Sequence, residues 1–141
     1  MKKSFTPILI VFAILIFTVP TYAANVPNFR RVAGDSVRGG KKSDDEGYHV
    51  YYYWPKEPLT YDSSLVNKYN ALLQESGFEL VDYETRTYRY GNDYGTKYYN
   101  TWFFRYKGRC VIFELLRSTV GIDGTTRFSV KVENGLTYEK D

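Results

Sequence analysis

The sequence predicts an α+β fold in which one helix packs on a curved antiparallel sheet. A helical period of apolar residues is found at one place, residues 63–76. Five other segments are rich in aromatic and β-branched residues, which favour strands. Short turn sequences separate the last four of these segments. The predicted order is therefore a strand, the helix and a four-stranded antiparallel meander.

The first predicted strand covers residues 48–54, which are aromatic or β-branched throughout. Pro55 ends this strand, because proline has no N–H to donate to a sheet. Pro55 and Pro58 then predict an irregular connection to the helix.

The predicted helix, residues 63–76, has one apolar face. The spacing i, i+4, i+7 and i+8 puts on that face Leu65, Tyr69, Leu72 and Leu73. Gly77 stands where a helix favours a left-handed residue, and Phe78 after it supplies the closing hydrophobic contact. We expect the apolar face to pack on the sheet.

The last four strands are predicted at residues 79–90, 97–106, 109–118 and 126–133. If Lys107 and Gly108 form a two-residue turn, Trp102 lies opposite Phe113 and Phe104 lies opposite Val111. This face and the helix stripe together give the predicted core: Leu65, Leu72, Leu73, Trp102, Phe104, Val111 and Phe113.

Residues 1–23 have the three-part pattern of a secretory signal peptide. Lys2 and Lys3 precede an apolar run at residues 8–19, and small residues precede a predicted cut after Ala23. The run spans about 18 Å as a helix, less than the roughly 30 Å hydrocarbon core of a bilayer. We expect a periplasmic or secreted protein with no membrane span after signal removal; an uncleaved N-terminal anchor is the alternative.

The remaining chain is predicted to have two parts. Residues 24–46 lack a sustained hydrophobic period and carry a basic half and an acidic half, which predicts a flexible charged lead segment. The alternative is a tether to an anionic surface. Residues 47–141 are predicted to form the single α+β domain.

Charge and composition argue against several classes of function. Without Lys2 and Lys3 the formal net charge falls from +3 to +1, which gives no reason to expect nucleic-acid binding. One Cys and one His supply no metal-ligand spacing, and no phosphate-binding glycine motif is present, so we expect no metal and no cofactor. Cys110 and His49 leave a Cys/His enzyme as a minor alternative.

The predicted order of one strand, one helix and four strands is similar to that of the cystatins, and Val32 and Gly34 are similar to their inhibitory Val-x-Gly loop. In that family the loop follows the helix, whereas here it precedes the helix. Arg30 also stands where the family has glutamine. We therefore assign no family and transfer no inhibitory residues.

Tyrosine is the strongest compositional signal, with 15 Tyr beside 9 Phe and 2 Trp. Several tyrosines gather at one end of a predicted hairpin, interleaved with basic residues. The candidate binding residues there are Tyr88, Arg89, Tyr90, Tyr94, Lys97, Tyr98 and Tyr99. Tyr and Arg are enriched in protein interfaces. The alternative is that these tyrosines only pair across strands.

The favoured function is a small exported, non-catalytic binding protein. It would dock a protein partner, as inhibitors and immunity proteins do, through the hairpin or an aromatic face of the sheet. The alternative is a cell-wall or glycan-binding module that uses the same rings as sugar platforms. Few carboxylates and amides lie near the rings in the sequence, only Asn92, Asp93 and Asn100, which favours the protein partner.

Overall fold

The computed structural model describes residues 25–57, 63–91, 95–120 and 124–140. The predicted signal peptide, residues 1–23, lies outside the described residues. The elements in chain order are β1 (Asn25–Val26), α2 (Arg30–Ala33), a 3-10 turn (Gly34–Ser36), β2 (Val37–Asp45), β3 (Tyr48–Pro55), α3 (Ser63–Glu75), β4 (Glu79–Tyr90), β5 (Gly95–Tyr106), β6 (Arg109–Ser118), β7 (Thr125–Glu133) and β8 (Thr137–Tyr138).

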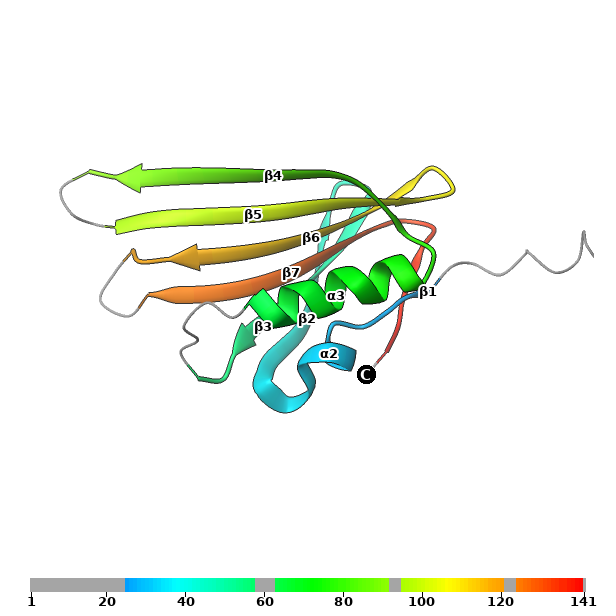
Figure 1. Ribbon diagram of the computed structural model, residues 1–141, viewed down its shortest axis with the longest axis horizontal. Helices are drawn as coiled ribbons and strands as arrows, with labels where there is room; N and C mark the ends of the chain where they lie inside the picture. Colours follow the sequence, from blue (N-terminus) through cyan, green and yellow to red (C-terminus); the bar gives the residue numbers. More distant parts are fainter. Residues whose placement is uncertain (1–24, 58–62, 92–94, 121–123, 141) are drawn as a thin grey trace, which may run out of the picture.

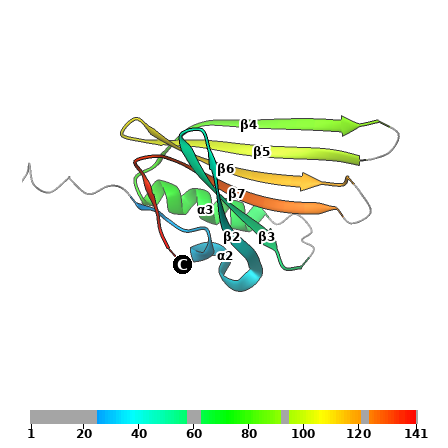
Figure 2. The ribbon, with the colours of Figure 1, turned by 180° about the vertical axis from the view of Figure 1, so that it is seen from behind.

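The chain is α+β, and it has more sheet than the sequence predicted. Six antiparallel strands form one sheet in the order β2-β3-β7-β6-β5-β4, and β1 pairs in parallel with β8 (Figures 1 and 2). The meander β4 to β7 follows the predicted order, whereas β3 closes onto β7, far away in the sequence. No helix in the described part of the chain is long and apolar enough to cross a membrane.

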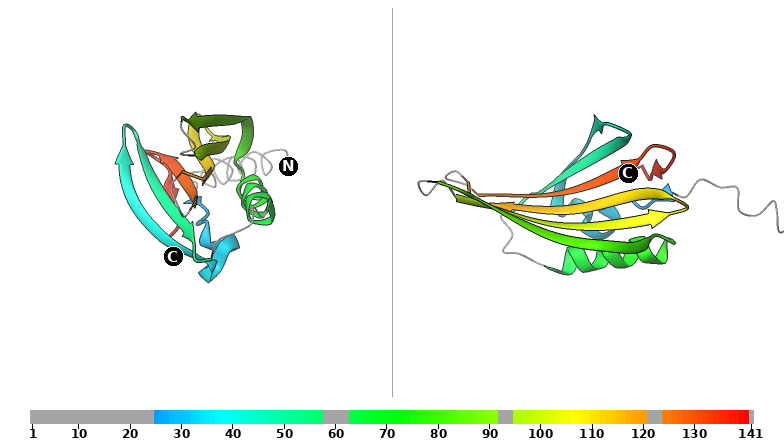
Figure 3. Two further views of the ribbon diagram at one scale, coloured as in Figure 1. Left: turned by 90° about the vertical axis from the view of Figure 1, so that its left-hand side faces the viewer. Right: turned by 90° about the horizontal axis from the view of Figure 1, so that it is seen from above.

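The sheet is curved, and α2 and α3 lie on its concave side (Figure 3). We call this side of the sheet the inner face and the opposite side the outer face. The ends of β4 to β7 that are distant from α3 extend past the helix (Figure 1). The core therefore lies under one half of the meander, and the other half is covered less.

The predicted register of the β5–β6 hairpin is confirmed. Trp102 pairs with Phe113 and Phe104 with Val111. Lys107 and Gly108 have φ angles of 46° and 78°, as both central residues of a type I′ turn require. A two-residue turn of this kind fixes the register, so the local sequence was sufficient to predict it.

Helix α3 is confirmed within one residue of its predicted end. Gly77 has φ 95°, and the Phe78 N–H donates to the Leu73 carbonyl over 3.0 Å, which closes the helix as expected. Of the predicted core, the fully buried residues are Leu73, Phe104, Val111 and Phe113. The half-buried residues that pack against them are Leu65, Leu72 and Trp102.

The prediction of a flexible lead over residues 24–46 was wrong for residues 25–45, which contain β1, α2 and β2. Phe29 is completely buried, and its ring lies 4.8–5.6 Å from four aromatic rings of the core. The residues of this segment that are buried in the core are Val26, Phe29, Ala33 and Val37. They belong to β1, to the two ends of the short helix α2 and to β2, so their spacing of three, four and four positions does not come from one continuous element.

Buried tyrosine hydroxyls tie this N-terminal segment to the rest of the core. The Phe29 N–H donates to the Tyr138 hydroxyl at 2.8 Å, and the Tyr53 and Tyr138 hydroxyls are 2.6 Å apart. The Tyr69 hydroxyl donates to the Pro27 carbonyl at 2.7 Å. Residues from both ends of the described chain thus meet α3 and β3 inside the fold.

Gly39 gives a test of the docking of β2. Its φ is 116°, and a Cβ built there overlaps the carbonyl oxygen of Tyr52 on β3. We expect Gly39→Ala to lower the free energy of unfolding by about 1–3 kcal/mol in urea titrations. Gly91, which has open space around it, is the matched control, and Gly91→Ala should have almost no effect. Equal, negligible effects of both substitutions would contradict the pairing of β2 with β3 at this bulge.

Candidate functional site

Strand alternation divides the predicted tyrosine-rich hairpin between the two faces of the sheet. The predicted residues on the outer face are Tyr88, Tyr90, Lys97 and Tyr99. Those on the inner face are Arg89 and Tyr98, and Tyr94 lies outside the described residues. The structure therefore does not bring the predicted residues together as a single site.

The outer face holds the larger part of the hairpin cluster. Tyr88 meets Tyr99 edge to face, with ring centroids 5.6 Å apart, and the Arg86 guanidinium lies 5.3 Å from the centre of the Tyr99 ring. Lys97 lies 5.6 Å from the centre of the Tyr90 ring. Tyr88 is 47% exposed, so this part of the surface is open to a partner.

A second aromatic and basic group lies on the same outer face, on β3 and β7. Tyr52 and Trp54 stack with ring centroids 6.2 Å apart. The Arg127 guanidinium lies 4.9 Å from the centre of the Tyr52 ring. This group depends on the β3–β7 pairing, in which Tyr52 is opposite Ser129.

Glu114 on β6 joins the two groups. Its carboxylate lies 3.7 Å from the Arg86 guanidinium and 3.9 Å from the Arg127 guanidinium, and it accepts a hydrogen bond from Thr101 at 3.3 Å. The two guanidiniums thus share one carboxylate as ion-pair partner, and each also faces an aromatic ring. We call this array the aromatic surface, and it consists of Tyr52, Trp54, Arg86, Tyr88, Tyr99 and Arg127.

Sequence reasoning found only part of this surface. Tyr88 and Tyr99 were candidate binding residues, whereas Tyr52, Trp54 and Arg127 were not. The alternation of Phe128, Val130 and Val132 was a usable signal, since it puts Arg127 on the face opposite to the core. Nothing in the local sequence indicates that β7 lies between β3 and β6.

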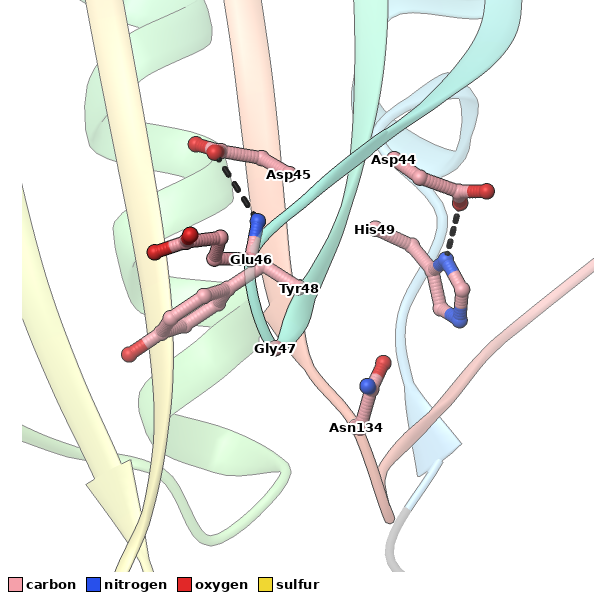
Figure 4. A pocket seen from close by; sticks show the side chains of 7 residues that line it. All are labelled: Asp44, Asp45, Glu46, Gly47, Tyr48, His49 and Asn134. Carbon is pink, nitrogen blue, oxygen red and sulfur yellow. Dashed lines mark hydrogen bonds and ion pairs between the residues drawn. The ribbon is translucent and has the colours of Figure 1, made fainter.

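An open pocket lies at the β2–β3 turn (Figure 4). There the Asp44 carboxylate meets the His49 ring at 2.6 Å. Asp45 accepts a hydrogen bond from the Lys131 ammonium at 2.6 Å, and this bond, with the positive charge, lowers the pKa of the Asp45 carboxyl. These two acids thus have partners in the protein, and no group of three or more His, Cys, Asp or Glu residues among the described positions could hold a metal ion.

The Cys/His pair does not form a catalytic dyad. His49 is opposite Val132, and Val132 is opposite Val111, so these three side chains share one face of the sheet. Cys110 is next to Val111 in β6 and therefore points to the other face. The sheet thus separates the thiol from the imidazole.

Comparisons with known proteins give no relative from which a function could be transferred. No family model matches the chain. No curated protein and no solved structure matches it either.

Proposed function

We propose that this chain is a non-catalytic binding protein that docks a protein partner through the aromatic surface. The observation that carries the proposal is the connected array of rings and guanidiniums across β4, β5, β6, β7 and β3. Tyr, Trp and Arg are the residue types most enriched among interface hot spots. Export to the periplasm or the medium, as inhibitors and immunity proteins require, is part of the same proposal and is supported by the sequence pattern of residues 1–23.

The surface is built for recognition with little loss of side-chain freedom. Tyr and Trp have few rotatable bonds, and Arg86 and Arg127 already have an ion-pair partner in Glu114 and a ring partner each. A partner therefore needs to order few additional side chains on this protein, which limits the entropic cost of binding. Strands also position side chains more firmly than loops do.

Charge supports a protein partner over a glycan. A sugar platform uses carboxylates or amides around each ring to bind hydroxyl groups, and on the aromatic surface Glu114 is already bound by two guanidiniums. The exposed guanidinium edges are suited to carboxylates and carbonyls of a protein rim instead. The glycan alternative remains an outcome of the test.

The test uses the purified chain as bait, followed by a measured dissociation constant for each captured and purified protein. We expect the double variant Tyr88→Ala/Arg127→Ala to weaken binding of the true partner at least about 30-fold, as loss of hot-spot residues does. The matched control is Tyr98→Ala, because Tyr98 is 39% exposed but lies on the inner face. It should change the dissociation constant less than about threefold.

Two outcomes would overturn the proposal. In one, Tyr98→Ala abolishes binding and the double variant binds normally, which would put the interface on the inner face. In the other, the chain binds purified cell-wall polysaccharide through the aromatic surface and captures no protein. Thermal unfolding of each variant establishes that the loss of binding is not a loss of fold.

A further inference from the structure

The two edges of the main sheet are finished differently. At the β2 edge the Arg30 guanidinium donates to the carbonyls of Val37 and Gly39, each at 3.0 Å, and a bulge interrupts the strand between Gly39 and Lys41. Capping and bulges of this kind prevent further strand pairing. At the other edge, all twelve residues of β4 are exposed, and no described strand lies on the side of β4 that faces away from β5 (Figure 1). The irregularity of β4 lies near its start, between Leu80 and Asp82, and the rest of the strand is regular.

The hydrogen-bonding groups on the free side of β4 can be identified from its neighbour. The Thr96 N–H donates to Thr119, beyond β6, so it points away from β4. Its partner Arg89 therefore directs its own N–H away from β5, because paired residues alternate in an antiparallel ladder. The backbone N–H and carbonyl groups of Thr87, Thr85 and Tyr83 point to the same free side of β4. Of these, the Tyr83 N–H donates a hydrogen bond to the Asp82 carboxylate at 2.8 Å.

The charges of β4 are self-complementary about its centre. Acidic Asp82 and Glu84 precede the middle of the strand, and basic Arg86 and Arg89 follow it. If a second β4 pairs antiparallel with Thr85 opposite Thr85, then Glu84 lies opposite Arg86 on both sides of the twofold axis. These are non-hydrogen-bonded pairs, in which side chains lie closest.

Each neighbouring register has a like-charge pair on its axis. A shift of the axis by one residue toward the start of the strand puts Glu84 opposite Glu84, although it also puts Asp82 opposite Arg86 on both sides, and a shift toward the end puts Arg86 opposite Arg86. The Thr85 register has the opposite-charge pairs without a like-charge pair. Like charges directly opposite each other destabilise a sheet. The Thr85 register pairs residues 82 to 88, which lie in the regular part of the strand beyond the irregularity between Leu80 and Asp82.

We propose that β4 is a homodimer edge, which pairs antiparallel with β4 of a second copy about Thr85 and makes one continuous sheet of the two molecules. On pairing, the Tyr83 N–H gives up its hydrogen bond to the Asp82 carboxylate and donates instead to the Thr87 carbonyl of the second copy. The aromatic surfaces of both copies then lie on the same face of the joined sheet. This inference goes beyond the proposed function and does not depend on it.

The test is the mass in solution of the chain expressed from all 141 residues, measured by sedimentation equilibrium. We expect a mass of two chains, and a dimer dissociation constant at least about tenfold higher in Glu84→Arg and in Arg86→Glu, because each substitution creates two like-charge pairs. The double variant Glu84→Arg/Arg86→Glu restores opposite charges and should dimerise again. Circular dichroism confirms the fold of each variant.

A crosslinking experiment tests the register without relying on charge. In a Cys110→Ser background, Thr85→Cys puts two thiols opposite each other, with Cα atoms about 5.5 Å apart. Thr87→Cys, the control, separates the two Cα atoms by about 14 Å along the strands. A short bifunctional thiol reagent should link the first variant and not the second.

A single-chain mass at about 100 μM chain would overturn the proposal, since a specific dimer edge should associate at that concentration. A dimer that both single charge variants leave intact would also overturn it. So would crosslinking at position 87 in preference to position 85.

Discussion

Replacement of Phe29 by Ala is expected to lower the free energy of unfolding by about 3–5 kcal/mol. Phe29 is completely buried and packs among Tyr53, Tyr69, Phe113 and Phe128. Removal of its ring leaves a cavity that these large rings cannot collapse to fill. Urea unfolding followed by tryptophan fluorescence measures the effect.

Arg31→Ala is the matched control for Phe29→Ala, because both residues belong to the same short segment. The Arg31 side chain is 52% exposed, and its ion pair with Glu139 is 3.5 Å long. Exposed pairs of this kind contribute little, so the free energy of unfolding should change by less than about 1 kcal/mol. If Phe29→Ala had as small an effect, the N-terminal segment would not be part of the core.

The second large effect is a loss of stability at alkaline pH. Burial raises the pKa of the Tyr138 hydroxyl and that of the Tyr69 hydroxyl well above their usual value of 10.0. The unfolded chain therefore releases these two protons near pH 10, whereas the folded protein retains them. Stability is full below about pH 10 and falls above it by about 1.4 kcal/mol per pH unit for each tyrosine.

Urea titrations between pH 8 and about pH 12 measure this loss, which should approach about 2.7 kcal/mol per pH unit from the two residues together. Tyr138→Phe is the matched variant, since it keeps the ring and removes one proton. The substitution removes the hydrogen bond from the Phe29 N–H at neutral pH. Above about pH 10 it should halve the decrease in unfolding free energy per pH unit. An unfolding free energy that stays constant up to pH 12 would refute the burial of these hydroxyls.

The elements that sequence analysis found are those with local determinants. Helix α3 has a 3.6-residue apolar period and a glycine at its end, and the β5–β6 turn has two residues that tolerate positive φ. Both features act within a few residues of each other in the chain. The bounds of α3 and the register of the hairpin were therefore predictable from the sequence.

The N-terminal segment and the aromatic surface depend on distant parts of the chain. Phe29 is surrounded by residues that are at least 24 positions away, and Tyr138 binds the Phe29 N–H from the other end of the fold. Likewise, Arg127 meets Tyr52 only because β7 pairs with β3. One sequence contains no signal for such pairings, so the hairpin half of the surface was predicted and the β3–β7 half was not.

The most direct test of the aromatic surface as a docking site is photo-crosslinking in living cells. A photoreactive amino acid replaces Tyr52, which is remote from the β4 edge, or Tyr98 on the inner face, which serves as the control. The proposed function predicts one major adduct with another protein at position 52, identified by mass spectrometry, and little or no protein adduct at position 98. Protein adducts at position 98 with none at position 52 would contradict it.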